Sequence, residues 1–332
     1  MLSYQKRIDR KRVMLKILII GTGAVGLGLA SFLLQSGCRA SLIGRELTVN
    51  SLAANGLDRV GIFDDIHFPP ESFAVFSTIK AVSLEQFDFA LVCVKSFDTE
   101  TVGQQIKNST FQKSSSVKFV LCQNGWGNAE TFSKFVPQEN IFSARIITGF
   151  TCPERNKVDV TVHAQPLHLG SLYGEDLEGL MPLAQAFREG GIPSVVTQDI
   201  SKDLWAKMLY NCPLNALGAL FDVSYGLLGE NKNTRQIMEL IVNEVFSVMH
   251  AMGYGTHWNN SKSYLEDFYG KLLPSTYDHE SSMLQDLRAG KMTEIEAING
   301  VIVLEGEKRN ILVPGNSMIR NLLQFLQGRS GK

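Results

Sequence analysis

A short apolar run that leads directly into a glycine-rich turn constrains this chain more than any other feature. Residues 15–20 read LKILII, residues 21–26 read GTGAVG, and an apolar segment follows over 27–34. This order predicts a strand, a tight turn and a helix, which is the context that a dinucleotide-binding fingerprint requires. Because the bare glycine pattern also occurs by chance in loops, its position after a strand carries the prediction.

The residues of the turn have different expected roles. Gly21 allows the tight turn, Gly23 lets backbone N–H groups approach a pyrophosphate, and Gly26 lets the helix pack closely against the strand. The N-terminus of the helix would present unpaired N–H groups and the positive end of its dipole to the phosphates. The predicted cofactor contacts of the turn are Gly21, Thr22, Gly23, Ala24, Val25 and Gly26.

The end of the second expected strand, over 39–43, indicates which dinucleotide is preferred. An acid at this point would bind the ribose 2′-hydroxyl of NAD, and it would repel a 2′-phosphate. Here the strand is followed by Gly44 and Arg45, and a guanidinium can pair with a phosphate through two hydrogen bonds. The sequence therefore favours NADP(H) over NAD(H). The alternative is that Arg45 is a solvated loop residue and that Glu46, one position further on, takes the place of the acid.

The first two hundred residues alternate between strand-like and helix-like patterns. Nearly continuous apolar runs at 89–94 and 117–122 are typical of buried parallel strands, and 99–106 can form the helix between them. The other expected elements are irregular or antiparallel additions over 57–83, a hairpin-like pair of 158–163 and 166–170 that extends the sheet, a helix over 175–189 and a strand over 193–197. We expect an NADP-binding Rossmann-type domain over residues 14–200.

After residue 200 the spacing of apolar residues becomes helical. The expected helices are 202–221, 234–252, 261–272, 281–289 and 294–309. The predicted fold class is therefore α/β, with an N-terminal Rossmann-type domain followed by an all-helical substrate domain over 201–330. Ligands bind beyond the carboxyl ends of the strands in such sheets, so the cleft between the two domains suits a small substrate.

Composition limits the classes of function. Hydrophobic residues make up 44% and charged residues 20% of the chain, and the formal net charge is -1, so neither nucleic acid nor an anionic membrane is indicated as a partner. No apolar run approaches the roughly 18–20 residues of a membrane span. The five cysteines are scattered and without a Cys-x-x-Cys pair, which fits free thiols in a reducing cytoplasm and argues against a zinc site. We expect no metal ion.

The first thirteen residues do not fit the expected fold. They are basic, and they lack the apolar core of a signal peptide. Met14 stands directly before the first strand. Residues 1–13 are expected to be a disordered extension, or the result of an upstream start codon with Met14 as the usual beginning; organelle targeting is a weaker third alternative.

Three polar residues form one stripe on the first helix of the second part. Lys207, Asn211 and Asn215 are spaced i, i+4, i+8 in an otherwise apolar segment. A substrate with a carbonyl, carboxylate or hydroxyl would supply the partners that such a row needs, and Lys207 could protonate a forming alkoxide. The alternative is a solvated lysine beside two asparagines that bond within the helix. Pro213, expected to kink the helix and free the carbonyl of Leu209, favours the functional interpretation.

Two polar residues follow the ends of expected strands. Asn124, in the segment QNGWGN at 123–128, could reach a nicotinamide or the substrate, and Lys95 could neutralise a cofactor phosphate. The alternatives are an ordinary Asn-Gly turn and a plain surface lysine.

The segment 281–300 also carries polar residues, whose readings from the residues alone are mainly structural. Thr293 with Glu296 fits a capping box. Glu294 would be the first helical residue, where the helix dipole favours an acid. Ser282 could be only an N-cap.

Taken together, these motifs resemble the ketopantoate reductase family (2-dehydropantoate 2-reductases), over nearly the whole chain from about Met14 to about Gln327. The motifs are GTGAVG at 21–26, VKSFDT at 94–99, QNGWGN at 123–128, WAKMLYNCPLNAL at 205–217 and SSMLQDLRAGKMTEIEAING at 281–300. The last two are specific, because few other Rossmann enzymes combine them.

The resemblance implies a role for each matching residue. Lys207 matches the lysine that binds the keto acid and donates a proton, and Glu294 matches a catalytic-site glutamate placed against the nicotinamide ribose. Asn124 matches the asparagine at the junction of cofactor and substrate. The residues that match substrate contacts are Asn211, Asn215 and Ser282, and those that match residues near the 2′-phosphate are Arg45 and Lys95.

The activity implied by the resemblance is the NADPH-dependent reduction of ketopantoate to pantoate, a precursor of coenzyme A, in the cytoplasm. The expected partner is a small 2-keto acid, with a homodimer left open. The chain departs from the family at Gly218, where a hydroxyl residue is frequent, at Asp98, where a polar amide can occur, and at Tyr225, where a further substrate-side asparagine can occur. Two alternatives remain: a reductase of another branched 2-keto acid, and a non-catalytic NADPH-binding sensor.

Overall fold

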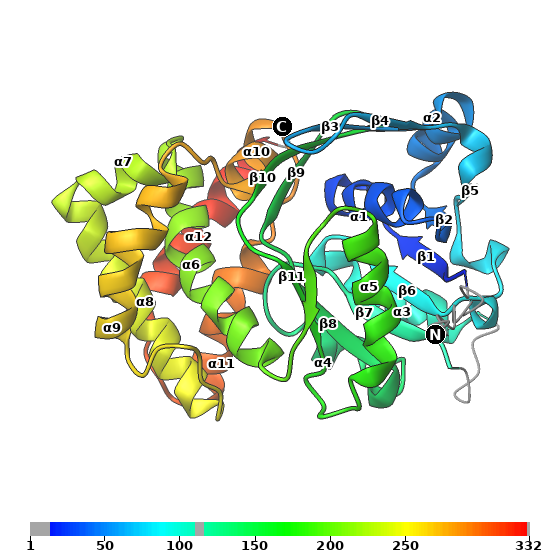
Figure 1. The fold of residues 1–332 in the computed structure, drawn as a ribbon. Coiled ribbons are helices and arrows are strands. Elements are labelled where there is room, and N and C mark those ends of the chain that lie inside the picture. Colours follow the sequence, from blue (N-terminus) through cyan, green and yellow to red (C-terminus); the bar gives the residue numbers. More distant parts are fainter. Residues whose placement is uncertain (1–13, 110–115, 331–332) are drawn as a thin grey trace, which may run out of the picture.

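The protein has a sheet-based half followed by a helical half, as seen in a computed structural model that describes residues 14–109 and 116–330 (Figure 1). The predicted extension over 1–13 lies outside the described residues. The sheet-based half runs from blue to green in Figure 1 and the helical half from yellow-green to red.

An eight-stranded sheet forms the centre of the first half. Its strand order is β12-β11-β8-β7-β6-β1-β2-β5. The strands are β1 (Lys16–Ile20), β2 (Arg39–Ile43), β5 (Ala74–Phe76), β6 (Phe89–Val92), β7 (Lys118–Leu121), β8 (Ile141–Arg145), β11 (Leu167–Gly170) and β12 (Ser194–Val196). Neighbouring strands are parallel except for β8 and β11. The central strands are buried on both faces, which explains their nearly continuous apolar sequences.

Helices connect the strands of this sheet, as the alternating pattern predicted. They are α1 (Ala24–Gln35), α2 (Glu46–Asn55), α3 (Thr99–Lys107), α4 (Asn128–Phe132) and α5 (Met181–Glu189). The glycine turn lies between β1 and α1, so the predicted order of strand, turn and helix is confirmed. Because β1, β6 and β7 are parallel, the segments that follow them meet at one edge of the sheet.

A second sheet of four strands corrects one prediction. Its order is β4-β3-β10-β9, with β3 (Leu57–Gly61), β4 (Ile66–Phe68), β9 (Thr148–Glu154) and β10 (Lys157–His163). The prediction that 158–163 and 166–170 pair with each other is wrong, because β10 pairs with β9 and β3 whereas β11 joins the main sheet. The unpredicted β9 lacks an apolar alternation, and it forms the hairpin with β10 instead.

The described chain is helical from Ile200 onward, which confirms the predicted helical half. Its helices are α6 (Ile200–Phe221), α7 (Tyr225–Glu230), α8 (Lys232–Ala251), α9 (Ser261–Asp267), α10 (Ser282–Arg288), α11 (Val301–Lys308) and α12 (Pro314–Ser330), with π-helical turns at Phe268–Leu272 and Glu296–Gly300. We did not predict α7 and α12. Helix α6 begins at Ile200, directly at the predicted domain boundary between residues 200 and 201, and this boundary stays a prediction.

Helix α6 is the central element of the helical half. It packs against α8, α10 and α12, and it also contacts β8 of the main sheet. The helix continues through Pro213 to Phe221, so the proline does not end it. Since α6 contacts both halves, its polar stripe is positioned relative to the sheet as well as to the other helices.

The two halves share a hydrophobic cluster at their junction. Trp126, in the loop between β7 and α4, is 5% exposed and belongs to the core of the helical half. Its ring centroid lies 4.6 Å from that of Trp205 in α6 and 4.8 Å from that of Tyr254, which follows α8. The loop that carries Asn124 is thus anchored in the other half. Within the described residues, no helix combines the length and the apolar character that a membrane crossing requires.

Candidate active site

The glycine turn has the backbone geometry that only glycine accommodates. Gly21 has φ of 108°, and its N–H donates to the carbonyl of Ile43 at 2.8 Å. A Cβ at Gly21 would lie 2.8 Å from the backbone of Cys93 and Val94, at the end of β6. The expected role of Gly21 in the turn is therefore confirmed, and its second constraint is the close approach of β6.

Gly23 and Gly26 differ in their surroundings as the fingerprint predicts. A Cβ at Gly26 would lie 1.9 Å from the carbonyl oxygen of Gly21, so the helix approaches the turn too closely for any side chain. A Cβ at Gly23 would meet nothing within 4 Å. Gly23 precedes α1, whose first residues are Ala24 and Val25, and the first N–H groups of a helix have no partner within it. Open space before unpaired N–H groups fits a dinucleotide pyrophosphate.

Arg45 and Glu46 both lie at the carboxyl end of β2. Arg45 directly precedes α2, Glu46 is the first residue of that helix, and both side chains are exposed. The neighbouring turn is close, because a Cβ at Gly44 would lie 1.9 Å from the hydroxyl of Thr22. Both candidates for the 2′-end of the cofactor therefore stand beside the glycine turn, and the choice between them stays a prediction.

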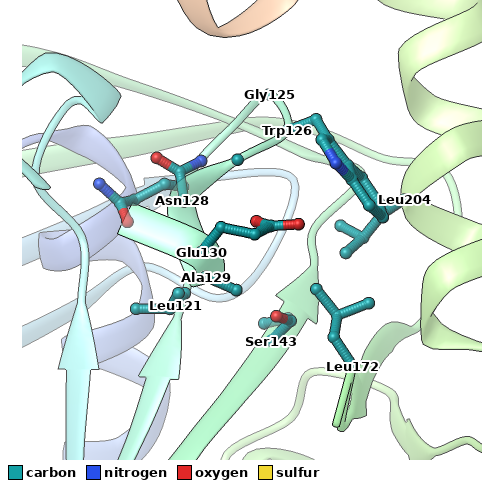
Figure 2. Close-up of a pocket in the computed structure, with 12 residues that line it drawn as sticks. Leu121, Gly125, Trp126, Asn128, Ala129, Glu130, Ser143, Leu172 and Leu204 are labelled. Atoms are coloured by element: carbon teal, nitrogen blue, oxygen red, sulfur yellow. The ribbon is translucent and has the colours of Figure 1, made fainter. Parts of the chain in front are cut away.

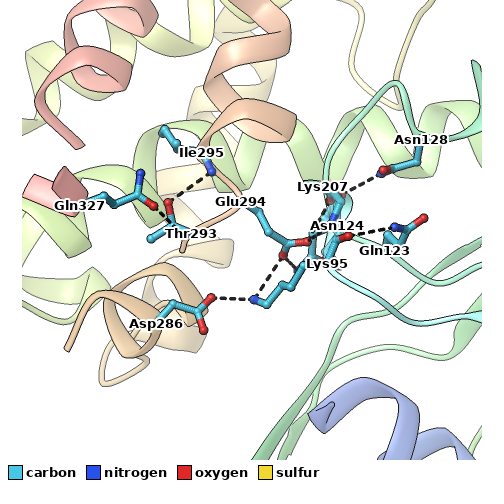
Figure 3. A network of polar contacts seen from close by, with 11 residues as sticks. Lys95, Gln123, Asn124, Asn128, Lys207, Asp286, Thr293, Glu294, Ile295 and Gln327 are labelled. Atoms are coloured by element: carbon cyan, nitrogen blue, oxygen red, sulfur yellow. Dashed lines mark hydrogen bonds and ion pairs between the residues drawn. The ribbon is translucent and has the colours of Figure 1, made fainter. Parts of the chain in front are cut away.

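Lys207 is held at the junction of the two halves. Its Nζ donates to Oδ1 of Asn124 at 2.8 Å (Figure 3). It also donates to the carbonyl of Ile146 at 2.6 Å. Burial, assisted by the Arg145 guanidinium and opposed by the Glu294 carboxylate, lowers the pKa of Lys207 from 10.5 to about 8. The ammonium has three N–H donors and uses two of them, so one remains for another acceptor. The alternative of a plainly solvated lysine is wrong.

Asn124 joins Lys207 to Glu294. Its Oδ1 accepts from Lys207, and its Nδ2 donates to Oε2 of Glu294 at 3.1 Å. The other carboxylate oxygen of Glu294 accepts from the N–H of Ser96 at 3.0 Å and from its hydroxyl at 2.9 Å. Glu294 is 6% exposed, and each oxygen of this buried carboxylate accepts at least one hydrogen bond. The structure thus brings three of the predicted site residues into one network.

Lys95 lies at the edge of the same network, as Figure 3 shows. Its Nζ is 2.6 Å from Oδ2 of Asp286 in α10 and 3.6 Å from Oε2 of Glu294. Burial opposes the charge, but the carboxylates of Glu294 and Asp286 outweigh it and raise the pKa of Lys95. Lys95 is therefore not a plain surface lysine. Its contact with a cofactor phosphate stays a prediction.

The two asparagines of the predicted stripe lie deeper in the helical half. Asn211 is 8% exposed and Asn215 is 4% exposed. Oδ1 of Asn215 accepts from the hydroxyl of Tyr225 at 2.6 Å, and its backbone carbonyl accepts from the hydroxyl of Ser281 at 3.2 Å. The Nδ2 of Asn215 is not used in these two bonds. Tyr225, one of the three residues that depart from the family pattern, thus fixes the orientation of this amide.

Ser282 is not an N-cap, and this corrects one alternative. The cap of α10 is Ser281, whose hydroxyl accepts from the N–H of Leu284 at 3.0 Å. Ser282 is the first helical residue, and its side chain is exposed. Its hydroxyl is therefore accessible to a ligand, and the substrate contact stays a prediction.

The predicted capping box at Thr293 and Glu296 is also wrong. The N–H of Thr293 donates to Oε1 of Gln327 in α12 at 2.6 Å, and Glu296 instead forms an ion pair with Arg320 at 2.8 Å. The helical segment begins at Ile295, so Glu294 lies just before it. The unpredicted α12 supplies these partners, which is why the local pattern failed. Because Glu294 lies before the helical segment, its carboxylate does not act only as a cap.

Sequence reasoning missed four residues of this region. Ser96 and Asp286 lie inside the quoted motifs, but we assigned them no role. Arg145 and Asp203 are buried charges; Arg145 precedes Ile146, whose carbonyl accepts from Lys207, and Asp203 lies one turn before Lys207 on α6. Asp203 had a usable signal, because it precedes Lys207 by four residues and extends the polar stripe by one turn.

A small cavity lies beside the loop that carries Gly125 and Trp126 (Figure 2). Its volume is about 20 Å³, and residues that line it include Gln123, Trp126, Ser143 and Leu172. This space holds about one water molecule and is too small for a keto acid. Within the described residues, no group of three or more His, Cys, Asp or Glu side chains could hold a metal ion.

Comparison with known families covers both halves of the chain. Residues 17–174 match the family described as Ketopantoate reductase PanE/ApbA, and residues 199–327 match the Ketopantoate reductase PanE/ApbA C-terminal domain. The 2-dehydropantoate 2-reductase of Aquifex aeolicus is 33% identical over 317 residues, which cover 94% of this chain and 97% of that protein. The enzyme of the same name from Archaeoglobus fulgidus is 27% identical over 319 residues, which cover 94% of this chain and 98% of that protein.

Solved structures have the same fold. A 2-dehydropantoate 2-reductase from Geobacter metallireducens GS-15 has a TM-score of 0.84 at 25% identity, with 93% of this chain and 99% of that chain covered. D-mandelate dehydrogenase, in a ternary structure with NADH and anilino(oxo)acetate, has a TM-score of 0.84 at 23% identity, with 96% of this chain and 100% of that chain covered. With both halves matched and a relative that is similar from end to end, the chain belongs to the ketopantoate reductase family, whose members are nicotinamide dinucleotide oxidoreductases.

Proposed function

We propose that this protein reduces 2-dehydropantoate to pantoate, with NADPH as the hydride source and Lys207 as the proton donor. The observation that carries the proposal is the hydrogen-bonded series Lys207–Asn124–Glu294, which connects the carboxyl edge of the sheet to the helical half. The relatives named 2-dehydropantoate 2-reductase support the same substrate.

The cofactor would be held by the turn over 21–26, with Arg45 and Lys95 toward its 2′-phosphate and Glu294 toward its nicotinamide ribose. When bound, NADPH supplies the hydride that goes to C2 of the keto acid. The open space at Gly23 before the unpaired N–H groups of α1 supports this placement. Arg45 supports NADPH over NADH, because a guanidinium attracts the additional phosphate.

Lys207 would hold the keto oxygen and protonate it. The Nζ already donates to Asn124 and Ile146, so the third N–H is directed by the other two and does not rotate freely. A preorganised cation stabilises the negative charge that develops on the oxygen, and a pKa of about 8 keeps the group protonated at neutral pH but ready to transfer the proton. Asn211, Asn215 and Ser282 would hold the carboxylate and hydroxyl of the substrate.

The test is an assay of purified protein in which oxidation of NADPH is followed with ketopantoate, with NADH in parallel. Rapid turnover that prefers NADPH is the expected result. Tight binding of NADPH without turnover on any member of a panel of 2-keto acids would contradict the proposal and indicate a sensor.

A matched pair of variants tests the cofactor preference. Arg45→Glu should shift the ratio of NADPH to NADH efficiency by about tenfold or more toward NADH, because a charge-assisted hydrogen bond contributes about 1.5–3 kcal/mol. Glu46→Gln, at the neighbouring exposed position, should leave the ratio unchanged. The opposite pattern would give the role to Glu46.

A second candidate substrate is another branched 2-keto acid. The hydroxyl of Tyr225 donates a hydrogen bond to Oδ1 of Asn215. In the family, the position of Tyr225 can instead hold a further asparagine on the substrate side. The same panel of keto acids separates the two candidates, because a preferred substrate other than ketopantoate would give the highest kcat/KM.

A further inference from the structure

A buried carboxylate lies one helical turn before the proposed proton donor. Asp203 and Lys207 are four residues apart on α6 and therefore share a face of the helix. Asp203 is 5% exposed. A buried charge is costly unless it is paired, so the partners of Asp203 show what it does.

Asp203 connects three separate segments of the chain. Its Oδ2 lies 2.7 Å from Nδ1 of His168 in β11, and its Oδ1 lies 2.8 Å from Nε2 of His257 in the segment between α8 and α9. One carboxylate thus fastens the first turn of α6 to the main sheet on one side and to the helical half on the other. The His257 side chain is 43% exposed, whereas that of His168 is 23% exposed.

A second buried charge, that of Arg145, lies on the same face of the main sheet as His168. Arg145 is the register partner of His168 across β8 and β11, so their side chains project from the same face. Arg145 is 4% exposed; its guanidinium donates to Gln165 and to the carbonyl of Pro166, and among the described residues its Nε has no partner. The Asp203 carboxylate compensates this charge, because its attraction opposes the effect of burial on Arg145.

Arg145 also adjoins the proton donor. The next residue, Ile146, provides the carbonyl that accepts from Lys207. Arg145 disfavours the charged form of Lys207, whereas Glu294 favours it. Several charged and titratable groups therefore act on Lys207 or on Asp203, its neighbour on α6. They are Arg145 from β8, Glu294 from the segment before Ile295, His168 from β11 and His257 from the segment after α8.

We propose that Asp203 is a positioning residue for proton transfer: held by His168 and His257, it balances the charge of Arg145 and keeps the Lys207 ammonium protonated at Asn124. This inference rests on the proposed function for its link to turnover, but not for the electrostatic effect itself. Removal of the carboxylate leaves Arg145 uncompensated, and the uncompensated guanidinium then disfavours a second cation nearby.

The test compares D203N with D199N. Asp203→Asn keeps the size of the side chain and removes its charge. Asp199→Asn makes the same change on the exposed residue before the same helix, which pairs with Lys202. The first readout needs no substrate: the full-length protein carries unmodified lysines labelled with 13C at Cε, the Lys207 signal is identified by its loss in K207R, and its titration is followed by NMR.

D203N should lower the titration midpoint of Lys207 by roughly one pH unit, as expected when one negative charge is lost one helical turn away in a partly polar interior. D199N should leave the midpoint within about 0.2 unit, because water and salt screen an exposed charge. An unchanged midpoint in folded D203N overturns the proposal, even if activity falls, because the role of Asp203 would then be structural only.

R145Q is the second variant, and it should shift the titration midpoint of Lys207 in the opposite direction. Loss of the guanidinium should raise the midpoint of Lys207, so a fall or no movement in folded R145Q also overturns the proposal. The second readout is the pH profile of kcat/KM with NADPH and ketopantoate, whose basic limb should move with the NMR midpoint. Absence of turnover in the unmodified protein would contradict the proposed function, while the NMR titration would still decide on Asp203.

Discussion

The glycine turn and the Lys207 junction are built in opposite ways. Six consecutive residues make the turn, and its contacts are backbone contacts set by the absence of side chains at Gly21, Gly23 and Gly26. The junction is made of side chains from α6, from the loop after β7 and from the segment before Ile295. The turn needs only β1, α1 and the neighbouring strands β2 and β6, all of which belong to the sheet-based half. The junction exists only when both halves of the molecule have folded together.

This difference determines how each region responds to mutation. In the turn, added atoms are harmful and their effect depends on the space at each position. In the junction, loss of a donor or an acceptor is harmful, and its effect passes along the series of hydrogen bonds. The following predictions exploit this contrast, beginning with the largest expected effect.

Lys207→Ala should lower kcat/KM by about 10²- to 10⁴-fold, the range for loss of a general acid. Binding of NADPH should change by less than about twofold, since the turn does not depend on this side chain. Steady-state kinetics and a fluorescence titration of NADPH measure the two effects. Unchanged turnover would refute the role of Lys207, and lost NADPH binding would mean that the two regions are not independent.

Gly26→Ala and Gly23→Ala should separate folding from binding within the turn. The methyl at residue 26 would overlap the carbonyl of Gly21, so the variant should lose about 2–4 kcal/mol of unfolding free energy. The methyl at residue 23 meets open space, so its cost should stay under about 1 kcal/mol while NADPH affinity falls roughly tenfold or more. Thermal unfolding and NADPH titration check both. Equal melting temperatures for the two variants would contradict the argument.

Glu294→Gln should lower kcat/KM by about 10- to 100-fold, because charge-assisted hydrogen bonds contribute about 1.5–3 kcal/mol. The new amide can place an NH2 group against the NH2 of Asn124, which would turn the oxygen of Asn124 away from Lys207. Glu296→Gln is the matched control, since that exposed acid pairs with Arg320 outside the junction. A loss of similar size in both variants would show that the effect is not specific to the junction.

The smallest expected effect is on stability and depends on pH. Burial holds the folded pKa of Lys207 at about 8, below its ordinary 10.5, so between these values the folded state binds fewer protons than the unfolded state. The unfolding free energy should therefore rise with pH in this window by roughly 1–3 kcal/mol relative to Lys207→Met, and the penalty should be complete below pH 8. Urea unfolding of both proteins at several pH values measures this difference. A difference that does not vary with pH would contradict the lowered pKa.

The same contrast explains what the sequence could predict. The turn, the parallel strands and the helical half follow from local apolar patterns, and the structure confirms them. The strand pairing of 158–163 was wrong because β9 lacks an apolar alternation and because the other partner of β10 is β3, which lies far earlier in the sequence. The capping box at Thr293 failed for the same reason, since Gln327 lies far along the chain. Local patterns do not encode partners that arrive through tertiary packing.

The sequence predicted the polar stripe on α6 but not its partners in the rest of the site. Helical spacing identified Lys207, Asn211 and Asn215, but only the resemblance to a family linked them to Asn124 and Glu294. No spacing rule connects residues 124, 207 and 294. The structure supplies that link, and it adds Asp203 and Ser96.

The burial of Trp126 in the core of the helical half has an optical consequence. The chain has three tryptophans, and Trp126, Trp205 and Trp258 all pack in or against that one core. Intrinsic tryptophan fluorescence therefore reports on the helical half and on its seam, or junction, with the sheet-based half, and it does not report on the glycine turn. Because one of the three indoles belongs to the sheet-based half, separation of the halves would expose it to water and shift its emission to the red. The protein carries its own probe for the integrity of that seam.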